Sequence, residues 1–315
     1  MCLESVVGKG RVVYVDSGST DGSVEMARGM GVEVVGLDLS TPFTAARARN
    51  EGFARLSALE PEVEFAQFVD GDCEVVAGWL ERAVEELTAK PKAAVVCGRR
   101  RERHREATLY NRLCDIEWDT PVGEAKACGG DAMIRAAAFR EVGGYDASVI
   151  AGEEPEMCVR LRAKGWKVFR VDADMTLHDA AMTRFGQWWK RNVRAGHAYA
   201  EGYTMHGAPP ERHGAKSVRS NWVWGLLVPA LIVALAWPLP IVSAVLLLAY
   251  PLMWFRIHRG ERRRGRSACD ARAYSMFVLL GKIPQAMGQL KFKWSRLRGK
   301  RSKLIEYKGA ALAAQ

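Results

Sequence analysis

Residues 64–74 read EFAQFVDGDCE, a short apolar strand that ends in two aspartates separated by one glycine. Asp70 and Asp72 therefore lie in one tight turn, where Gly71 lets the backbone come close to a ligand. Carboxylate oxygens suit Mg²⁺ or Mn²⁺, and these ions bind one or two protein carboxylates together with substrate phosphates. An acidic turn after a strand is also common without any ligand. The neighbouring sequence must decide between the two.

A second acidic strand end precedes this one in the chain. Residues 12–15, VVYV, form a run typical of a strand, and Asp16 follows directly, ahead of the Gly/Ser/Thr-rich turn at residues 17–23. In an open α/β sheet, ligands bind beyond the carboxyl ends of the strands. Two acidic strand ends in one stretch of alternating strands and helices therefore predict a shared nucleotide site.

The alternation itself extends from residue 11 to about residue 96. It predicts an α/β fold with a mostly parallel, Rossmann-like sheet. The strands expected from the pattern are 12–15, 32–36, 65–69, 93–97 and 167–171. The helices expected are 23–29, 44–59, 78–89, one ending near Phe139, 153–164, which stops at Gly165, and 183–203.

Three motifs occur in an order that resembles the family 2 glycosyltransferases: VDSGSTDGS at residues 15–23, DGD at 70–72 and GEEPEMCVRLRAKGW at 152–166. The resemblance covers about residues 2–202. It implies the GT-A fold of nucleotide-diphospho-sugar transferases and an inverting transfer of a sugar from UDP or GDP to a hydroxyl of a saccharide or lipid-linked acceptor. It also implies a divalent cofactor, Mn²⁺ or Mg²⁺, and a role in surface polysaccharide or glycolipid synthesis.

The resemblance implies roles for single residues of the donor site. Asp72 is the expected metal ligand, and Asp70 is expected to contact the ribose or the ion. Asp16 is expected to hold the nucleotide base. Arg49 is expected to pair with the diphosphate, with Arg47 as a nearby competitor, and either arginine could instead belong to a solvated helix face.

On the acceptor side, the family's acidic pair corresponds to Glu153 and Glu154, and Glu154 takes the position of the catalytic base. Glutamate replaces the commoner aspartate here. Crowded carboxylates should raise at least one pKa, which suits a base near neutrality, although acids also simply favour a helix N-terminus. Asp131 is expected to bind the acceptor or donor sugar, or to be a turn residue. His178 is expected either near the metal and diphosphate or in a structural role.

The first ten residues, MCLESVVGKG, correspond to the helix that follows the family's first strand. That N-terminal strand is therefore expected to be absent from this sequence. Either Met1 lies downstream of the true start, or the protein is shortened and its donor site is defective. The first explanation is favoured, because losing a central strand would leave backbone groups unpaired and apolar faces exposed.

Residues 222–255 contain no charged side chain and are interrupted by WPLP at 237–240. Each half has about 16 residues, or roughly 24 Å of helix against a hydrocarbon core of about 30 Å, so two spans and a re-entrant hairpin both stay open. A buried hairpin in a soluble protein is the third possibility. Lys and Arg on both flanks predict that both ends lie in the cytosol, at the inner (cytoplasmic) membrane.

The formal net charge of +10 is concentrated at the end of the chain, where residues 256–315 hold sixteen Lys/Arg against three Asp/Glu. Apolar residues alternate with these charges, as in a helix that lies on anionic membrane lipids, although a solvated helix packed on the domain has the same pattern. No nucleic-acid motif accompanies the charge, so nucleic acid is not an expected partner. The predicted division is a catalytic domain at 1–205, a linker at 206–220, a hairpin at 221–256 and a basic amphipathic tail at 257–315.

Two other functions are consistent with parts of this pattern. A non-catalytic membrane subunit would keep the fold but have a defective donor site. A nucleotidyltransferase that forms nucleotide-sugars would need a Gly-rich loop with a basic residue near the first strand, and the sequence from Met1 onward contains none. The glycosyltransferase is therefore the leading hypothesis.

Overall fold

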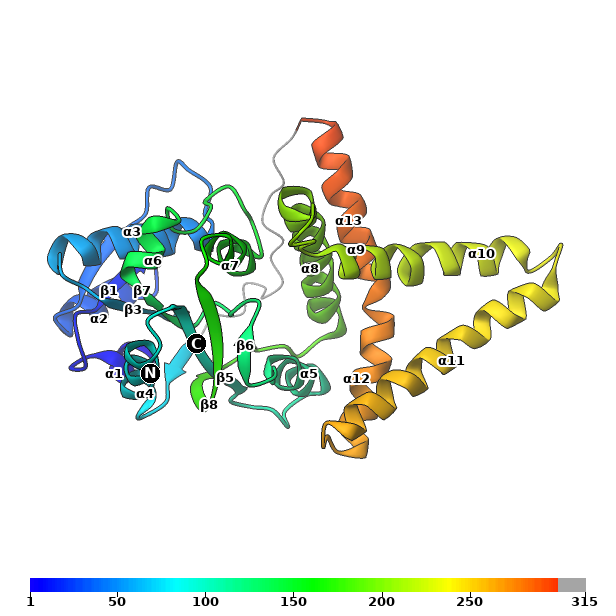
Figure 1. Cartoon of the computed structure of the whole chain (residues 1–315), viewed down its shortest axis with the longest axis horizontal. Helices are drawn as coiled ribbons and strands as arrows, with labels where there is room; N and C mark the ends of the chain where they lie inside the picture. The colour runs from blue at the N-terminus through cyan, green and yellow to red at the C-terminus, as the bar shows by residue number, and fades with distance from the viewer. Residues whose placement is uncertain (300–315) are drawn as a thin grey trace. The chain divides into compact units, whose positions relative to one another are not determined.

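A computed structural model describes residues 1–299 of the chain (Figure 1). The last part of the predicted tail at 257–315, residues 300–315, lies outside the described residues. Two compact units are present, and each is described by itself. The sheet unit contains residues 1–103 and 117–180, and the helical unit contains residues 104–116 and the described chain from 181 onward. The domain boundaries at 205, 220 and 256 stay predictions.

The sheet unit alternates strands and helices as the sequence predicts, which confirms the α/β fold class. Its elements are α1 (Cys2–Val6), β1 (Val13–Asp16), α2 (Ser23–Gly29), β2 (Glu33–Gly36), α3 (Ala45–Leu59), β3 (Phe65–Phe68), β4 (Cys73–Val75), α4 (Trp79–Ala89), β5 (Ala93–Glu102), β6 (Gly123–Ala125), β7 (Ala132–Arg135), α6 (Ala136–Glu141), α7 (Glu153–Ala163) and β8 (Lys167–His178). The helices form where apolar residues recur on one face. On α4, for example, Trp79, Ala83 and Leu87 are spaced by four residues and all three are buried.

The strands form two sheets with different pairing. β1 and β2 pair in parallel as a two-stranded sheet, and the larger sheet has the order β3-β7-β5-β8-β4, with β6 also paired to β8. β5 and β8 are parallel, whereas β7 is antiparallel to β3 and β5, and β4 and β6 are antiparallel to β8. The predicted mostly parallel sheet is therefore corrected to a mixed one. β4, β6 and β7 have only three or four residues each, which is too short to show a period in the sequence.

The core of the sheet unit holds the acidic turn in place. Residues 93–96 of β5 are fully buried, as expected for an unalternating apolar run in a strand covered on both faces. Phe68, two residues before Asp70, packs its ring against Phe53 of α3 at 6.4 Å and Phe139 of α6 at 5.4 Å between centroids. Two helices, α3 and α6, thus fix the end of β3, and with it the start of the DGD turn.

The helical unit contains a long helical hairpin, seen as the yellow helices of Figure 1. The elements of the helical unit are most of α5 (Leu109–Trp118), then α8 (Phe185–His206), α9 (Ala215–Trp222), the π-helical segment η1 (Val223–Leu227), α10 (Val228–Leu235), α11 (Pro240–Arg263), α12 (Ala268–Leu280) and α13 (Lys282–Leu297). The chain reverses at the predicted WPLP break, and Pro240 starts α11, where a missing N–H is tolerated.

The two arms of the hairpin are longer than the uncharged segment. The first runs continuously over Ala215–Leu235 and the second over Pro240–Arg263, 21 and 24 residues, or roughly 31 and 36 Å. Polar residues extend both helices beyond the apolar stretch, so the arms are longer than the apolar pattern predicts. Both arms have the length and composition of helices that cross a membrane, and few of their apolar residues are buried in the structure.

Glycines bring the backbones of α8 and α13 into direct contact. A Cβ added at Gly196 would lie 2.0 Å from the carbonyl oxygen of Gln285, and one added at Gly288 would lie 2.0 Å from that of Val193. Gly225 of η1 approaches Lys282 equally closely. Small residues at such crossings are typical of tightly packed helix pairs. The orientation of α13 about its own axis is therefore fixed.

Candidate functional site

The DGD turn is anchored by a buried aspartate from another segment. The backbone N–H of Asp70 donates to Oδ1 of Asp131 at 2.9 Å. Oδ2 of Asp131 accepts from the hydroxyl of Thr176 at 2.7 Å and lies 2.8 Å from Nη2 of Arg100. Asp131 is completely buried, so its carboxylate positions the turn. Its predicted contact with a sugar stays a prediction.

Asp70 lies between two arginines. Its Oδ1 is 2.7 Å from Nη2 of Arg49, and its Oδ2 is 3.2 Å from Nη2 of Arg100. Burial alone would raise the pKa of Asp70, but the two guanidinium groups outweigh it and hold that pKa below its usual value. Asp70 is therefore a charged group that is already paired within the protein.

Arg100 was not predicted from the sequence. It belongs to the basic run at residues 99–105, where nothing in the pattern distinguishes it from its neighbours. In the structure its partners distinguish it, because its guanidinium contacts Asp70 and Asp131 and lies 5.6 Å from the ring centroid of Trp118. In the sheet register Arg100 lies opposite Thr176 of β8, whose hydroxyl also contacts Asp131.

Arg49 connects the DGD turn to the predicted catalytic acids. Its Nη1 lies 2.8 Å from Oε1 of Glu153 and 3.1 Å from Oε1 of Glu154, while its Nη2 contacts Asp70. Arg49 comes from α3 and the glutamates from the first turn of α7. The structure therefore brings four of the predicted site residues, Arg49, Asp70, Asp131 and Glu154, into one connected network. The predicted pairing of Arg49 with a diphosphate stays a prediction.

Gly130 makes this convergence possible. A Cβ at this position would lie 2.5 Å from Nη2 of Arg49, 2.9 Å from Oδ2 of Asp70 and 3.1 Å from Oε1 of Glu154. A side chain would displace all three groups. Gly130, the second glycine of the CGGD sequence, therefore marks the point where α3, the DGD turn and α7 meet.

Glu154 has the electrostatics of a base that works near neutral pH. Burial and repulsion from Glu153 raise its pKa from 4.5 to about 7, although Arg49 opposes this rise. A general base is most effective when its pKa is close to the working pH. The glutamate that replaces the commoner aspartate therefore has a proton affinity suited to the predicted role.

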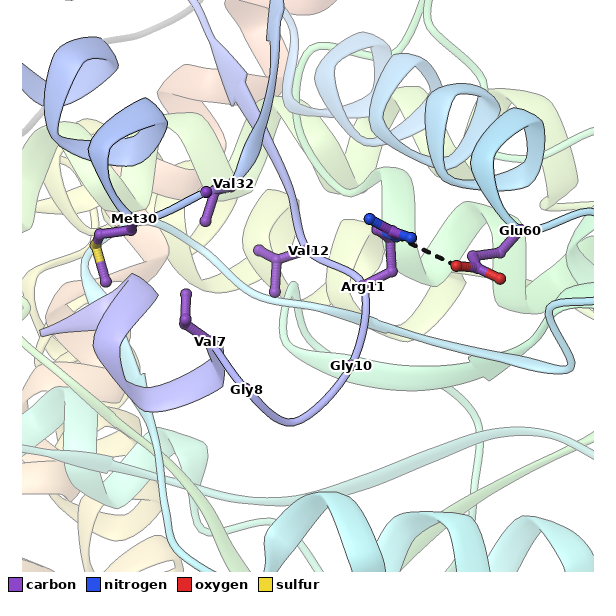
Figure 2. A pocket seen from close by; sticks show the side chains of 9 residues that line it. Val7, Gly8, Gly10, Arg11, Val12, Met30, Val32 and Glu60 are labelled. Atoms are coloured by element: carbon purple, nitrogen blue, oxygen red, sulfur yellow. Dashed lines mark hydrogen bonds and ion pairs between the residues drawn. The ribbon is translucent and has the colours of Figure 1, made fainter.

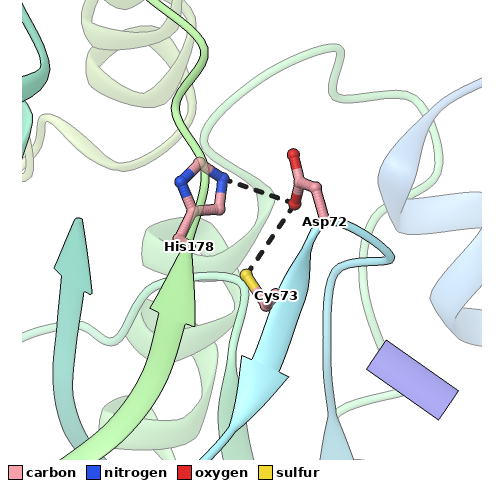
Figure 3. Close-up of side chains that lie close together, drawn as sticks. All are labelled: Asp72, Cys73 and His178. Atoms are coloured by element: carbon pink, nitrogen blue, oxygen red, sulfur yellow. Dashed lines mark hydrogen bonds and ion pairs between the residues drawn. The ribbon is translucent and has the colours of Figure 1, made fainter. Parts of the chain in front are cut away.

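Asp72 faces His178 across neighbouring strands (Figure 3). The register of β4 and β8 pairs Cys73 with His178, and Nε2 of His178 lies 3.3 Å from Oδ1 of Asp72. Trp118 packs its ring edge-on against the histidine at 4.8 Å between centroids. Nδ1 of His178 is buried and has no hydrogen-bond partner among residues 1–299.

The chemistry of this cluster fits a divalent cation. Ligand atoms of Asp72, Cys73 and His178 lie within 4.8 Å of one another. Burial raises the pKa of the Cys73 thiol far above its usual range, and a thiol is a soft donor that hard cations such as Mg²⁺ and Mn²⁺ do not favour. The remaining oxygen and imidazole donors suit Mn²⁺ better than a thiolate-seeking metal. Asp70 could serve as a further ligand only by exchanging one of its arginines.

Asp16 organises its own turn. Its Oδ2 accepts hydrogen bonds from the backbone N–H of Gly18 at 2.8 Å and of Ser19 at 3.2 Å. Burial would raise the pKa of Asp16, but hydrogen bonds from Ser19 and Gly18 hold it below its usual value. The aspartate is thus kept charged at the carboxyl end of β1. Its predicted convergence with the other acids stays a prediction.

A cavity of about 320 Å³ lies at the N-terminal ends of β1 and β2, away from Asp16 at the carboxyl end of β1 (Figure 2). Val12 and Val32 line it just before β1 and β2 begin, and the side chain of Arg11 pairs there with Glu60 at 3.2 Å. The residues of the acidic network do not line it. It is therefore distinct from the candidate site.

The chain is similar to known glycosyltransferases in sequence and in structure. The family model "Glycosyl transferase family 2" matches residues 2–142. The succinoglycan biosynthesis protein ExoA of Rhizobium meliloti (strain 1021) is 27% identical to this chain over 212 residues. The match covers 64% of this chain and 63% of that protein, which is less than two thirds of the relative's length. The structure of the mannosyltransferase PcManGT from Pyrobaculum calidifontis, in complex with GDP-Man and Mn²⁺, is similar with a TM-score of 0.59 at 17% identity, covering 93% of this chain and 82% of that one.

Proposed function

We propose that this chain, whose residues 2–142 match the model of glycosyl transferase family 2, is a membrane-associated inverting glycosyltransferase of that family that moves a sugar from UDP or GDP to a hydroxyl acceptor. The mixed α/β sheet and the likeness to PcManGT confirm the GT-A fold class. The name of the ExoA relative supports a product that is a polysaccharide. A surface polysaccharide or glycolipid is the product class that we infer.

The observation that carries the proposal is the network through Arg49. One guanidinium contacts Asp70 of the DGD turn and Glu153 and Glu154 at the start of α7. Donor-side and acceptor-side groups are therefore in direct electrostatic contact. A sugar transfer needs both sides at one place, because the departing diphosphate and the attacking hydroxyl lie on opposite faces of the same anomeric carbon.

In this proposal Glu154 accepts the proton of the acceptor hydroxyl as the oxygen attacks. Glu153 keeps the proton affinity of Glu154 high, and Arg49 holds both glutamates in position. Arg100 and Asp131 fix the DGD turn, so that Asp70 and Asp72 face the donor. Because Arg49 is a fork with five N–H donors, it can pair with a diphosphate while it keeps one carboxylate.

Asp72 and His178 are the residues that would hold the divalent cation, and Mn²⁺ or Mg²⁺ bound there would stabilise the negative charge of the departing diphosphate. The presence of Mn²⁺ in the PcManGT complex is consistent with this assignment. His178 was only a secondary candidate from the sequence. Its pairing with Asp72 across β4 and β8 makes it the better partner, since both oxygens of Asp70 contact arginines.

The membrane association rests on the helical hairpin. Both arms have the length and composition of membrane-crossing helices, and their apolar side chains are largely exposed in the structure. Exposed apolar helices of this length need a partner that removes them from water. Basic residues on both sides of the uncharged segment 222–255, such as Lys216 and Arg259, support an inner-membrane location with the sheet unit on the cytosolic side.

A thermal-shift measurement on the detergent-solubilised chain tests the donor site. UDP or GDP should stabilise the protein only when Mn²⁺ is present, by about 2.7 kcal/mol at a ligand concentration of 100 Kd. The variant Asp72→Ala should lose this stabilisation. Asp172→Ala, an exposed aspartate on the same strand as His178, serves as the control and should keep it.

Two results would contradict the proposal. Equal stabilisation by the nucleotide in Asp72→Ala and the wild type would remove the metal role of the DGD turn. No stabilisation by UDP or GDP under any condition would favour the alternative function, a non-catalytic membrane subunit that retains the fold.

A further inference from the structure

The last described helix, α13, carries an exposed apolar stripe along its whole length. Successive members are spaced by four, three, four and three residues, which returns each one to the same face of an α-helix. The residues of this stripe, with exposed fractions from 38% to 82%, are Ile283, Met287, Leu290, Trp294 and Leu297. A contiguous stripe of this kind is unusual on a solvated helix and marks an interaction surface.

The opposite face of α13 packs against the rest of the helical unit. Pro284, Gly288 and Gln289 are buried there, and the backbone contact of Gly288 with Val193 leaves no room for rotation. Gln285 also donates from Nε2 to Oδ1 of Asn192 on α8 at 2.8 Å. The helix therefore cannot turn to bury its apolar stripe against α8.

The charges on α13 are all of one sign. Residues 282–297 contain no Asp or Glu, and Lys291 and Lys293 lie roughly 80° to either side of the stripe at 100° per residue. The next residue after the helix, Arg298, stacks its guanidinium over the ring of Trp294 at 4.2 Å. An apolar stripe with basic margins on both sides is the pattern of a helix that lies in a membrane interface.

A contact with the hairpin sets the level of α13 relative to the apolar segment. Nζ of Lys293 lies 4.6 Å over the ring of Trp222, and Trp222 is the first residue of the uncharged segment. Gly225 of η1 also touches Lys282 of α13. The middle of α13 is therefore at the point where the hairpin leaves the polar part of the chain, which for an inserted hairpin is the membrane boundary.

We propose that the apolar stripe of α13 lies in the headgroup region of an anionic bilayer, parallel to its surface, with the basic margins contacting acidic lipid headgroups. This inference rests on the proposed membrane association of the hairpin and adds a second, in-plane attachment. Together the two attachments fix both the position and the rotation of the helical unit at the membrane. A second copy of the chain on the stripe is the competing occupant that the experiment must exclude.

Depth-dependent fluorescence quenching tests the proposal on the full chain in vesicles. An environment-sensitive probe is attached at Met287→Cys in the stripe, or at Leu248→Cys in the hairpin, both in a Cys269→Ser background because Cys269 is an exposed thiol. Lipids with a quencher near the headgroup should quench the stripe probe most, and lipids with a quencher deep in the acyl chain should quench the hairpin probe most. Vesicles contain either phosphatidylcholine alone or an equal mixture with phosphatidylglycerol.

The expected result is shallow quenching at position 287 that is stronger in the anionic vesicles. Replacing both Lys291 and Lys293 with Gln should weaken the docked state by about fivefold per charge in those vesicles and leave the hairpin probe unchanged. Leu290→Glu should also reduce the shallow quenching, because it places a carboxylate in the centre of the stripe.

The outcomes separate this inference from the proposed function. Deep quenching at position 248 without lipid quenching at 287 would overturn the role of α13 and leave the hairpin anchor intact. No quenching at either position would refute the membrane association itself. A blue-shifted probe at 287 that lipids do not quench, with self-association of the chain, would identify a second copy as the occupant and also overturn the proposal.

Discussion

Replacing Glu154 with Gln should stabilise the folded protein above pH 7 and abolish sugar transfer. Glu154 is only 13% exposed in its side chain and lies beside Glu153. The neutral amide has nearly the same shape but carries no charge, so it avoids the cost of holding an ionised carboxylate beside another one. A stabilising substitution that removes activity is typical of a functional group placed in an unfavourable environment.

The size of the effect follows from the pKa of Glu154. Its ordinary value is 4.5, and burial first, then Glu153, raise it to about 7 in the folded chain. Each pH unit is worth about 1.4 kcal/mol, so the ionised group costs on the order of 3 kcal/mol. Because the folded state binds the proton more tightly than the unfolded chain, the wild type loses this stability as the pH rises from about 4.5 to about 7. The Gln variant lacks that loss.

The assay is thermal unfolding of both proteins at intervals from pH 4.5 to 8.5. The two melting temperatures should differ little at the acidic end, and the variant should gain on the order of 5–10 °C above pH 7. Glu85→Gln, at a glutamate that is 71% exposed on α4, is the control and should show no pH-dependent gain. A constant difference across the pH range, or a variant that is less stable at pH 8, would refute the reasoning.

Three further predictions follow from the same structure. Arg100→Lys keeps the positive charge but cannot bridge two aspartates, so it should lower the melting temperature by several degrees and weaken nucleotide binding; unchanged values would argue against its positioning role. His178→Gln should weaken Mn²⁺ binding at least tenfold in a calorimetric titration while the melting temperature without metal changes little, and equal affinity would remove it as a ligand. Gly288→Ala should destabilise the helical unit by roughly 1–3 kcal/mol through overlap with the facing backbone, whereas Gly260→Ala, which has open space around it, should not.

Most of the sheet unit was predictable because its longer elements have clear periods. The strand 93–97, the helices 44–59 and 153–164 and the break at WPLP all appear where the pattern places them. The mixed pairing was not predictable, since β7 has four residues and its place between β3 and β5 depends on long-range contacts. Local patterns specify elements far better than they specify how short strands are ordered in a sheet.

The candidate site was predictable in its residue types and less so in its connections. Acidic residues after strands and before a helix could be read from the motifs. The partners of Arg49 could not, because a sequence does not show whether an arginine meets a phosphate or the carboxylates of Asp70 and Glu154. The partners of Arg100 could not be predicted either, for the same reason. Its role depends on which side of β5 faces the DGD turn.

The balance of charge at the candidate site constrains the order in which a donor can enter. Two guanidinium groups stand against five carboxylates, namely those of Asp70, Asp72, Asp131, Glu153 and Glu154. A bare nucleoside diphosphate would approach a region of excess negative charge and be repelled. A nucleotide that arrives already chelated to its cation would instead be drawn in. Two arginines are too few to offset these carboxylates for the proposed donor, so we expect the chain to bind the chelate far more tightly than the free nucleotide.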